Sequence, residues 1–164
     1  MAISFDTDHN PIVGKAEKLE DDLVVITADN ASPMTFTGTR TYILGTENLI
    51  VIDPGPNSEA HLSSIMKYIG KRKVTDILLT HSHIDHSPLS RQLKTETGAR
   101  IIGFGSADEA RTSFMKKLSS SLDLGGEEGI DKDLVPVKVI GLALFAVITA
   151  RSFSSCSASP ILGL

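Results

Sequence analysis

The sequence is poor in cysteine, has no excess of positive charge and contains no long apolar run. A single cysteine, Cys156, excludes an internal disulfide and is typical of a reducing compartment. The longest apolar run, residues 139–148, is shorter than the roughly 20 residues that a membrane-spanning helix needs. The first residues carry acids where a secretory signal peptide needs bases. We therefore expect a cytoplasmic protein without a membrane-spanning segment.

The length and the charge balance indicate a soluble globular domain. A chain of 164 residues is long enough for one domain with its own core, so we expect residues 1–164 to form a single domain. The net charge of −4 supplies no overall positive field that would attract nucleic acid. A nucleic-acid partner is therefore not favoured, although a local basic groove remains open.

Three of the five histidines lie within one short stretch, residues 80–86. His81 and His83 are two residues apart, so both point the same way if the strand before them continues. Asp85 and His86 follow at once and are free to turn toward a second ion. Imidazole and carboxylate are ligands that zinc prefers, so this pattern predicts a metal site. The alternative is a set of polar loop residues hydrated by water.

Around this motif the sequence predicts alternating strands and helices, an α/β class of fold. Predicted strands cover residues 23–27, 39–44, 49–52, 74–80, 100–104 and 137–149. Predicted helices follow Ser58 and Ser87, which we interpret as N-caps, and end before Gly70 and Gly98. A further helix is predicted over residues 106–118.

Two single residues near the motif need an interpretation. Asp53 closes a predicted strand just before Pro54 and Gly55, where its carboxylate can orient the metal-ligand loop by hydrogen bonding. The alternative is an ordinary turn-forming aspartate. His61 falls in the first turn of a predicted helix, and we expect it to be a surface side chain.

Three blocks of the sequence, residues 37–45, 49–55 and 77–90, resemble in the same order the opening blocks of the metallo-β-lactamase-fold hydrolases. The similarity is greatest to the branch that holds glyoxalase II-like thioesterases and β-lactamase-like ribonucleases. The resemblance implies the αββα sandwich of that family. At this length, the chain would hold the N-terminal half of the sandwich, with an incomplete second layer.

The resemblance also implies a chemistry, which is hydrolysis by a metal-activated water. His81 and His83 match family ligands of a first ion, whereas Asp85 and His86 match ligands of a second. Asp85 also matches a residue that helps to orient the attacking water, a catalytic role. The implied cofactor is zinc, as one or two divalent ions, with manganese or iron as alternatives. The implied substrate is a small molecule with a thioester, ester, lactam or phosphodiester bond.

The later part of the chain departs from the family pattern. The family has a further histidine block, a bridging aspartate and a late histidine, whereas no histidine follows His86 here. We therefore interpret residues 137–164 as atypical, the product of a shifted reading frame or a truncated gene; a natural short variant is the alternative. Two functions besides hydrolysis stay open. One is a catalytically silent metal-binding half-domain, completed by a partner or a second copy in a homo-oligomer, and the other is a metal-free interaction module.

Overall fold

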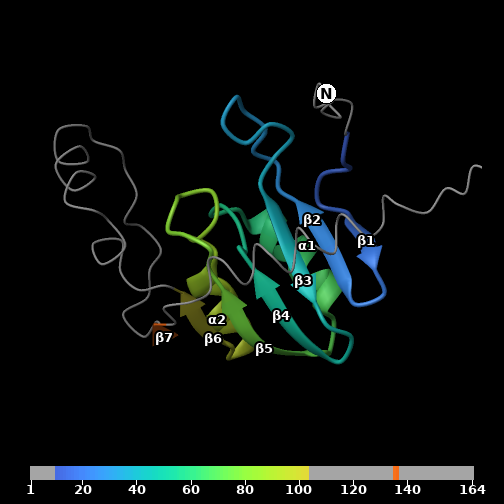
Figure 1. Ribbon diagram of the computed structural model, residues 1–164, viewed down its shortest axis with the longest axis vertical. Coiled ribbons are helices and arrows are strands. Elements are labelled where there is room, and N and C mark those ends of the chain that lie inside the picture. Colours follow the sequence, from blue (N-terminus) through green and yellow to red (C-terminus); the bar gives the residue numbers. More distant parts are fainter. Residues whose placement is uncertain (1–9, 104–134, 137–164) are drawn as a thin grey trace, which may run out of the picture.

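The computed structural model describes residues 10–103 and 135–136, and the strands in these ranges form one mixed sheet (Figure 1). The sheet order follows the chain order from β1 to β7. Strands β1 to β4 pair antiparallel, and strands β4 to β7 pair parallel. The bounds are β1 Ala16–Glu20, β2 Leu23–Thr27, β3 Arg40–Leu44, β4 Asn48–Ile52, β5 Lys73–Leu78, β6 Arg100–Gly103 and β7 Val135–Pro136.

Two helices make the crossovers that parallel strands require. Helix α1, Glu59–Ile69, joins β4 to β5, and helix α2, Ser90–Thr97, joins β5 to β6. Figure 1 shows both helices behind the sheet. The parallel register aligns Val51 of β4 with Ile77 of β5, so the carboxyl ends of the two strands meet at the same edge. Ligand sites in parallel sheets form at this edge.

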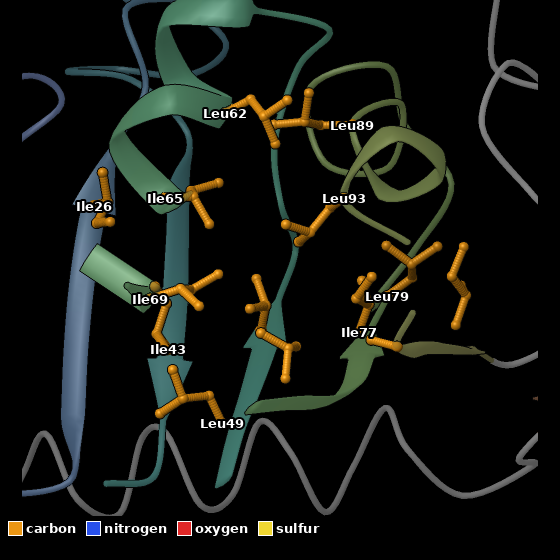
Figure 2. Close-up of a cluster of buried hydrophobic side chains, with 14 of the residues drawn as sticks. Ile26, Ile43, Leu49, Leu62, Ile65, Ile69, Ile77, Leu79, Leu89 and Leu93 are labelled. Atoms are coloured by element: carbon orange, nitrogen blue, oxygen red, sulfur yellow. The ribbon is translucent and has the colours of Figure 1, made fainter. Parts of the chain in front are cut away.

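The core lies between the two helices and the sheet (Figure 2). Leu62, Ile65 and Ile69 line one face of α1 at helical spacing. Leu89 and Leu93 complete the layer from α2 and the turn before it. Facing them are aliphatic side chains of the sheet, all buried: Val24, Ile26, Ile43, Leu49, Val51, Val74, Ile77 and Ile101.

Helix α1 begins and ends where the sequence predicts. The Ser58 hydroxyl accepts a hydrogen bond from the His61 amide at 3.3 Å, as an N-cap does. Gly70 follows the helix with φ of 60°, and its amide donates to the Met66 carbonyl. These two local signals set the bounds of the helix.

The prediction for the start of α2 is wrong. The Ser87 hydroxyl donates to the His83 carbonyl at 3.2 Å instead of capping the helix, and the helix begins only at Ser90. The intervening residues form a turn whose bonds fold the motif loop back on itself. Strand β5 likewise ends at Leu78, two residues before the predicted end, and strand β1 lies in a segment for which the sequence predicted no element.

Several predictions fall on residues that the structure does not describe. These are the helix over 106–118, the strand over 137–149, the atypical tail over 137–164 and the incomplete second layer. Within the described ranges, neither helix has the length and apolarity that a membrane span requires.

Candidate metal centre

Two chain segments meet at the sheet edge where β4 and β5 end. Asp53 directly follows β4, and its amide donates to the Leu78 carbonyl at the end of β5 at 2.9 Å. The backbone of Asp53 is left-handed, with φ of 48°, a conformation that a non-glycine residue adopts only when its surroundings enforce it. This turn aims the Asp53 carboxylate at the loop that follows β5.

The Asp53 carboxylate holds the beginning and the end of the histidine motif together. Its Oδ1 accepts the Thr80 amide at 2.8 Å, and its Oδ2 accepts the Thr80 hydroxyl at 2.5 Å. The same Oδ2 lies 3.0 Å from Nδ1 of His86. The side chain is buried, so these bonds form in a poorly solvated place where they are strong. Asp53 therefore bonds both ends of the motif loop, and whether it orients metal ligands stays a prediction.

The predicted metal ligands gather around this carboxylate. One ligand atom each from Asp53, His81 and His86 lie within 4.8 Å of one another. The His81 ring centroid is 4.1 Å from that of His86 and 4.5 Å from that of His83. Asp85 Oδ2 is 3.2 Å from His86 Nε2. All five residues therefore lie close together. The tightest group, however, is Asp53, His81 and His86. It includes Asp53, which the sequence predicted to be an orienting residue, and it leaves out the predicted ligands His83 and Asp85.

The exposure of the candidate ligands increases from Asp53, which is buried, to the outer histidines. Asp53 is 6% exposed, His86 and Asp85 are partly buried, and His81 and His83 are exposed. Asp85 is fixed from the sheet side by the Thr39 hydroxyl, which donates to its Oδ2 at 3.1 Å. A carboxylate below and imidazoles around an open side suit a divalent ion that must stay accessible to water and substrate.

His81 and His86, the two histidines grouped with Asp53, differ in basicity. Burial by itself lowers the pKa of His86, but the hydrogen bond to Asp53 and the charges of Asp53 and Asp85 outweigh it, so the pKa is raised above 6.5. His81 is exposed as a whole, but partial desolvation of its ring and the neighbouring His86 lower its pKa below 6.5. A proton on His86 would partly neutralise the carboxylates of Asp53 and Asp85, and a bound cation would do the same.

The expectation for His61 is wrong, because this histidine is buried. Its side chain is 3% exposed and lies between α1 and the sheet, where its Nε2 is 2.8 Å from the Thr41 hydroxyl. The spacing carried the signal, since His61 lies four residues before the core residue Ile65 and so shares its helix face. Sequence reasoning also missed the hydroxyls of Thr39, Thr41 and Thr80, which no local pattern marks.

The family model of the metallo-beta-lactamase superfamily matches residues 34–150 of the chain. The chain belongs to this superfamily. The resemblance and the α/β fold class inferred from the sequence are thereby confirmed.

Individual proteins agree with this assignment. The chain is 34% identical over 107 residues to the Beta-lactamase-like protein 2 homolog of Drosophila melanogaster. This alignment covers 59% of this chain and 36% of that protein. It is 33% identical over 97 residues to the hydroxyacylglutathione hydrolase of Ectopseudomonas mendocina, in an alignment that covers 59% of this chain and 32% of that protein. The chain thus spans about a third of the length of these curated relatives.

The fold is also similar to solved structures. A beta-lactamase domain protein from Burkholderia ambifaria superposes with a TM-score of 0.56 at 18% identity, over 79% of this chain and 44% of that one. At this identity the similarity concerns the arrangement of helices and strands. It places the described sheet and its two helices in the metallo-β-lactamase fold.

Proposed function

We propose that the chain carries the metal-binding part of a metal-dependent hydrolase that acts on a small-molecule substrate. The observation that supports it best is the gathering of Asp53, His81 and His86 within 4.8 Å at the end of two parallel strands. Membership of the superfamily and a relative named as a hydrolase point the same way. The lone cysteine supports a reducing, cytoplasmic location, and the length of 164 residues supports a single domain.

The described residues fit a divalent ion by their chemistry. His81, His83 and His86 would supply nitrogen ligands, and Asp85 and Asp53 would supply oxygen. We take zinc as the first candidate, as one ion or two, because imidazole with carboxylate is a common zinc donor set; manganese and iron remain alternatives. Bound there, the ion would lower the pKa of a water toward neutrality and polarise the bond to be cleaved.

The chain's own residues would divide the remaining work. The Asp53 carboxylate orients the loop through Thr80 and His86. Asp85, held by Thr39 and lying beside His86, is placed to accept a hydrogen bond from the attacking water and to orient it. We assign it the catalytic role on that basis.

For the substrate we favour a thioester. The relative from Ectopseudomonas mendocina is named for hydrolysis of an acylated glutathione, and this chain matches it over 59% of its own residues. Esters, lactams and phosphodiesters share the need for a polarised oxygen and an activated water, so they stay in the test. The net charge of −4 gives no support to a nucleic-acid substrate.

The experiment is turnover of a panel of thioesters, esters, a lactam and a phosphodiester by the full chain loaded with zinc. We expect thioester hydrolysis that a chelator abolishes, that added zinc restores and that is lost in Asp85→Asn. The matched control is Asp76→Asn, which changes a carboxylate paired with Arg100 on the sheet. Zinc binding without turnover would contradict the hydrolase and favour a silent half-domain. Absence of zinc binding would favour a metal-free module.

A further inference from the structure

The buried histidine of α1 touches the turn that carries Asp53. We propose that His61 is a positioning residue of the metal centre, acting as a neutral hydrogen-bond donor behind Thr41. Through the Thr41 hydroxyl it fixes the backbone carbonyl of Asp53, and its ring supports Gly55. The inference rests on the proposed function, since it concerns the same metal centre.

The hydrogen-bond chain determines which ring nitrogen carries the proton. The Thr41 hydroxyl has one hydrogen and donates it to the Asp53 carbonyl at 2.8 Å. The same oxygen lies 2.8 Å from His61 Nε2 and can then only accept. His61 must therefore be protonated at Nε2. Burial lowers the pKa of His61 to about 4, which agrees with an imidazole that is neutral at neutral pH.

The ring of His61 also supports the backbone beside Asp53. A Cβ at Gly55 would lie 2.9 Å from His61 Cδ2, so glycine is what allows the ring to pack there. The Gly55 amide donates to the His86 carbonyl at 3.0 Å, and the Gly55 carbonyl accepts the Leu89 amide at 3.3 Å. Movement of this turn would therefore displace the motif loop at His86 as well as Asp53.

The position that lets His61 bond Thr41 leaves its second ring nitrogen, Nδ1, unpaired among the described residues. This nitrogen is buried. An unpaired polar atom in a core is unfavourable, and a leucine could fill a similar volume without it. A residue needed only for packing would not be polar here, so the polar ring points to the bond it makes with Thr41.

The experiment compares five single variants and one double variant of the full chain. His61→Leu removes the donor, whereas His61→Gln keeps an N–H that reaches the same oxygen. Thr41→Val removes the hydroxyl, and Thr41→Ser keeps it. Ile65→Val, one turn further along α1, is the packing control. The measurements are zinc affinity by competition with a chromophoric chelator, hydrogen exchange of the Gly55 and Thr80 amides in metal-free protein, and the unfolding midpoint in urea.

We expect His61→Leu and Thr41→Val to weaken zinc binding about tenfold, the lower range for residues that orient metal ligands. Exchange at Gly55 and Thr80 should be faster in both, by more than the fall in the unfolding midpoint accounts for, because the effect is local to the turn. His61→Gln, Thr41→Ser and Ile65→Val should keep most of the affinity. The double variant His61→Leu with Thr41→Val should lose no more than either single one, because both break the same chain.

Wild-type affinity and exchange in a folded His61→Leu chain would overturn the inference, as would fully additive losses in the double variant. If His61→Leu does not fold, the Thr41→Val and Thr41→Ser pair decides, since equal affinity in these two also overturns it. If the wild type binds no zinc, the proposed function fails. Amide exchange in the metal-free variants then still shows whether His61 holds the turn.

Discussion

Two histidines are linked to Asp53, His86 directly and His61 through Thr41, and their surroundings shift their pKa values in opposite directions. His86 lies on the open side, 3.0 Å from the carboxylate of Asp53, and the carboxylates beside it raise its pKa. His61 lies on the core side, where it reaches the Asp53 carbonyl through Thr41, and burial lowers its pKa to about 4. A histidine side chain can therefore bind a proton or a cation on the open side, whereas on the core side it is a neutral hydrogen-bonding group.

This comparison makes the turn from Asp53 to Gly55 the junction between the core and the motif loop. On the metal side, the Asp53 carboxylate bonds Thr80 of the motif loop. On the core side, the Asp53 carbonyl bonds Thr41 and Gly55 lies against the His61 ring. Changes that act on the junction should affect both regions. Changes on the metal side should affect mainly metal binding, whereas changes on the core side should reach the metal site only through this turn.

Gly55→Ala should have the largest effect, because it acts on the junction. The added Cβ would meet the His61 ring at 2.9 Å, on a backbone with φ of +99°. Overpacking and left-handed strain together should lower the free energy of unfolding by about 3 kcal/mol. Gly98→Ala is the control, since φ is +70° there with nothing within 4 Å, and about 1 kcal/mol is expected. Urea unfolding that gives equal losses would remove the special status of this turn.

Asp53→Asn should act mainly on the metal side. The amide keeps the shape but removes the charge that faces Thr80 and His86. We expect zinc affinity to fall by about 100-fold, measured by chelator competition. Asp76→Asn, which disturbs the ion pair with Arg100, should leave the affinity unchanged. A similar small loss in both variants would show that Asp53 only forms a turn.

The core side should show itself in the pH dependence of stability. The folded pKa of His61, about 4, is below 6.5, so the unfolded chain binds the proton first as the pH falls. Stability due to neutral His61 is therefore present above about pH 6.5 and is lost between about 6.5 and 4. Between about pH 7.5 and 5, the free energy of unfolding of the wild type should fall by about 2 kcal/mol more than that of His61→Gln.

The matching measurement is chemical unfolding of metal-free protein at both pH values. His86 contributes in the opposite sense, because its raised pKa gives stability that is lost as the pH rises. That contribution is common to wild type and variant and cancels in the difference. Parallel curves for the two proteins would mean that His61 is not held neutral.

The smallest effect distinguishes the two serines that the sequence marks as helix caps. Ser58 accepts the His61 amide, so Ser58→Ala should lower the free energy of unfolding by about 1 kcal/mol. Ser87 donates to the His83 carbonyl, which also accepts the amides of His86 and Ser87. Ser87→Ala should therefore lose only about 0.5 kcal/mol. A larger loss in Ser87→Ala would mean that its hydroxyl caps α2 after all.

Local patterns in the sequence predicted most of the described fold. Strand β2 and helix α1 follow from an apolar run and from the signals at Ser58 and Gly70. The sequence did not predict the start of α2, because the Ser87 hydroxyl makes a local hydrogen bond to the His83 carbonyl, four residues earlier, instead of capping the helix.

The candidate site divides in the same way. The histidine motif is contiguous in sequence and so is visible there, and whether its residues bind a metal stays a prediction. Thr41 and His61 are 20 residues apart and Thr39 and Asp85 are 46 apart, and only the folded sheet brings them together. Sequence reasoning found the open side of Asp53 and missed the core side.

The central claim is that the motif and Asp53 bind a divalent metal, and zinc titration of the purified full chain tests it most directly. The measurement is bound zinc by elemental analysis, with affinity by calorimetry, in the wild type and in His81→Ala with His86→Ala. We expect zinc in stoichiometric amount in the wild type, a loss of binding in the double variant, and proton release on binding that grows as the pH is lowered, because a histidine ligand must be neutral. A wild type without zinc, or a double variant that binds as tightly as the wild type, would contradict it.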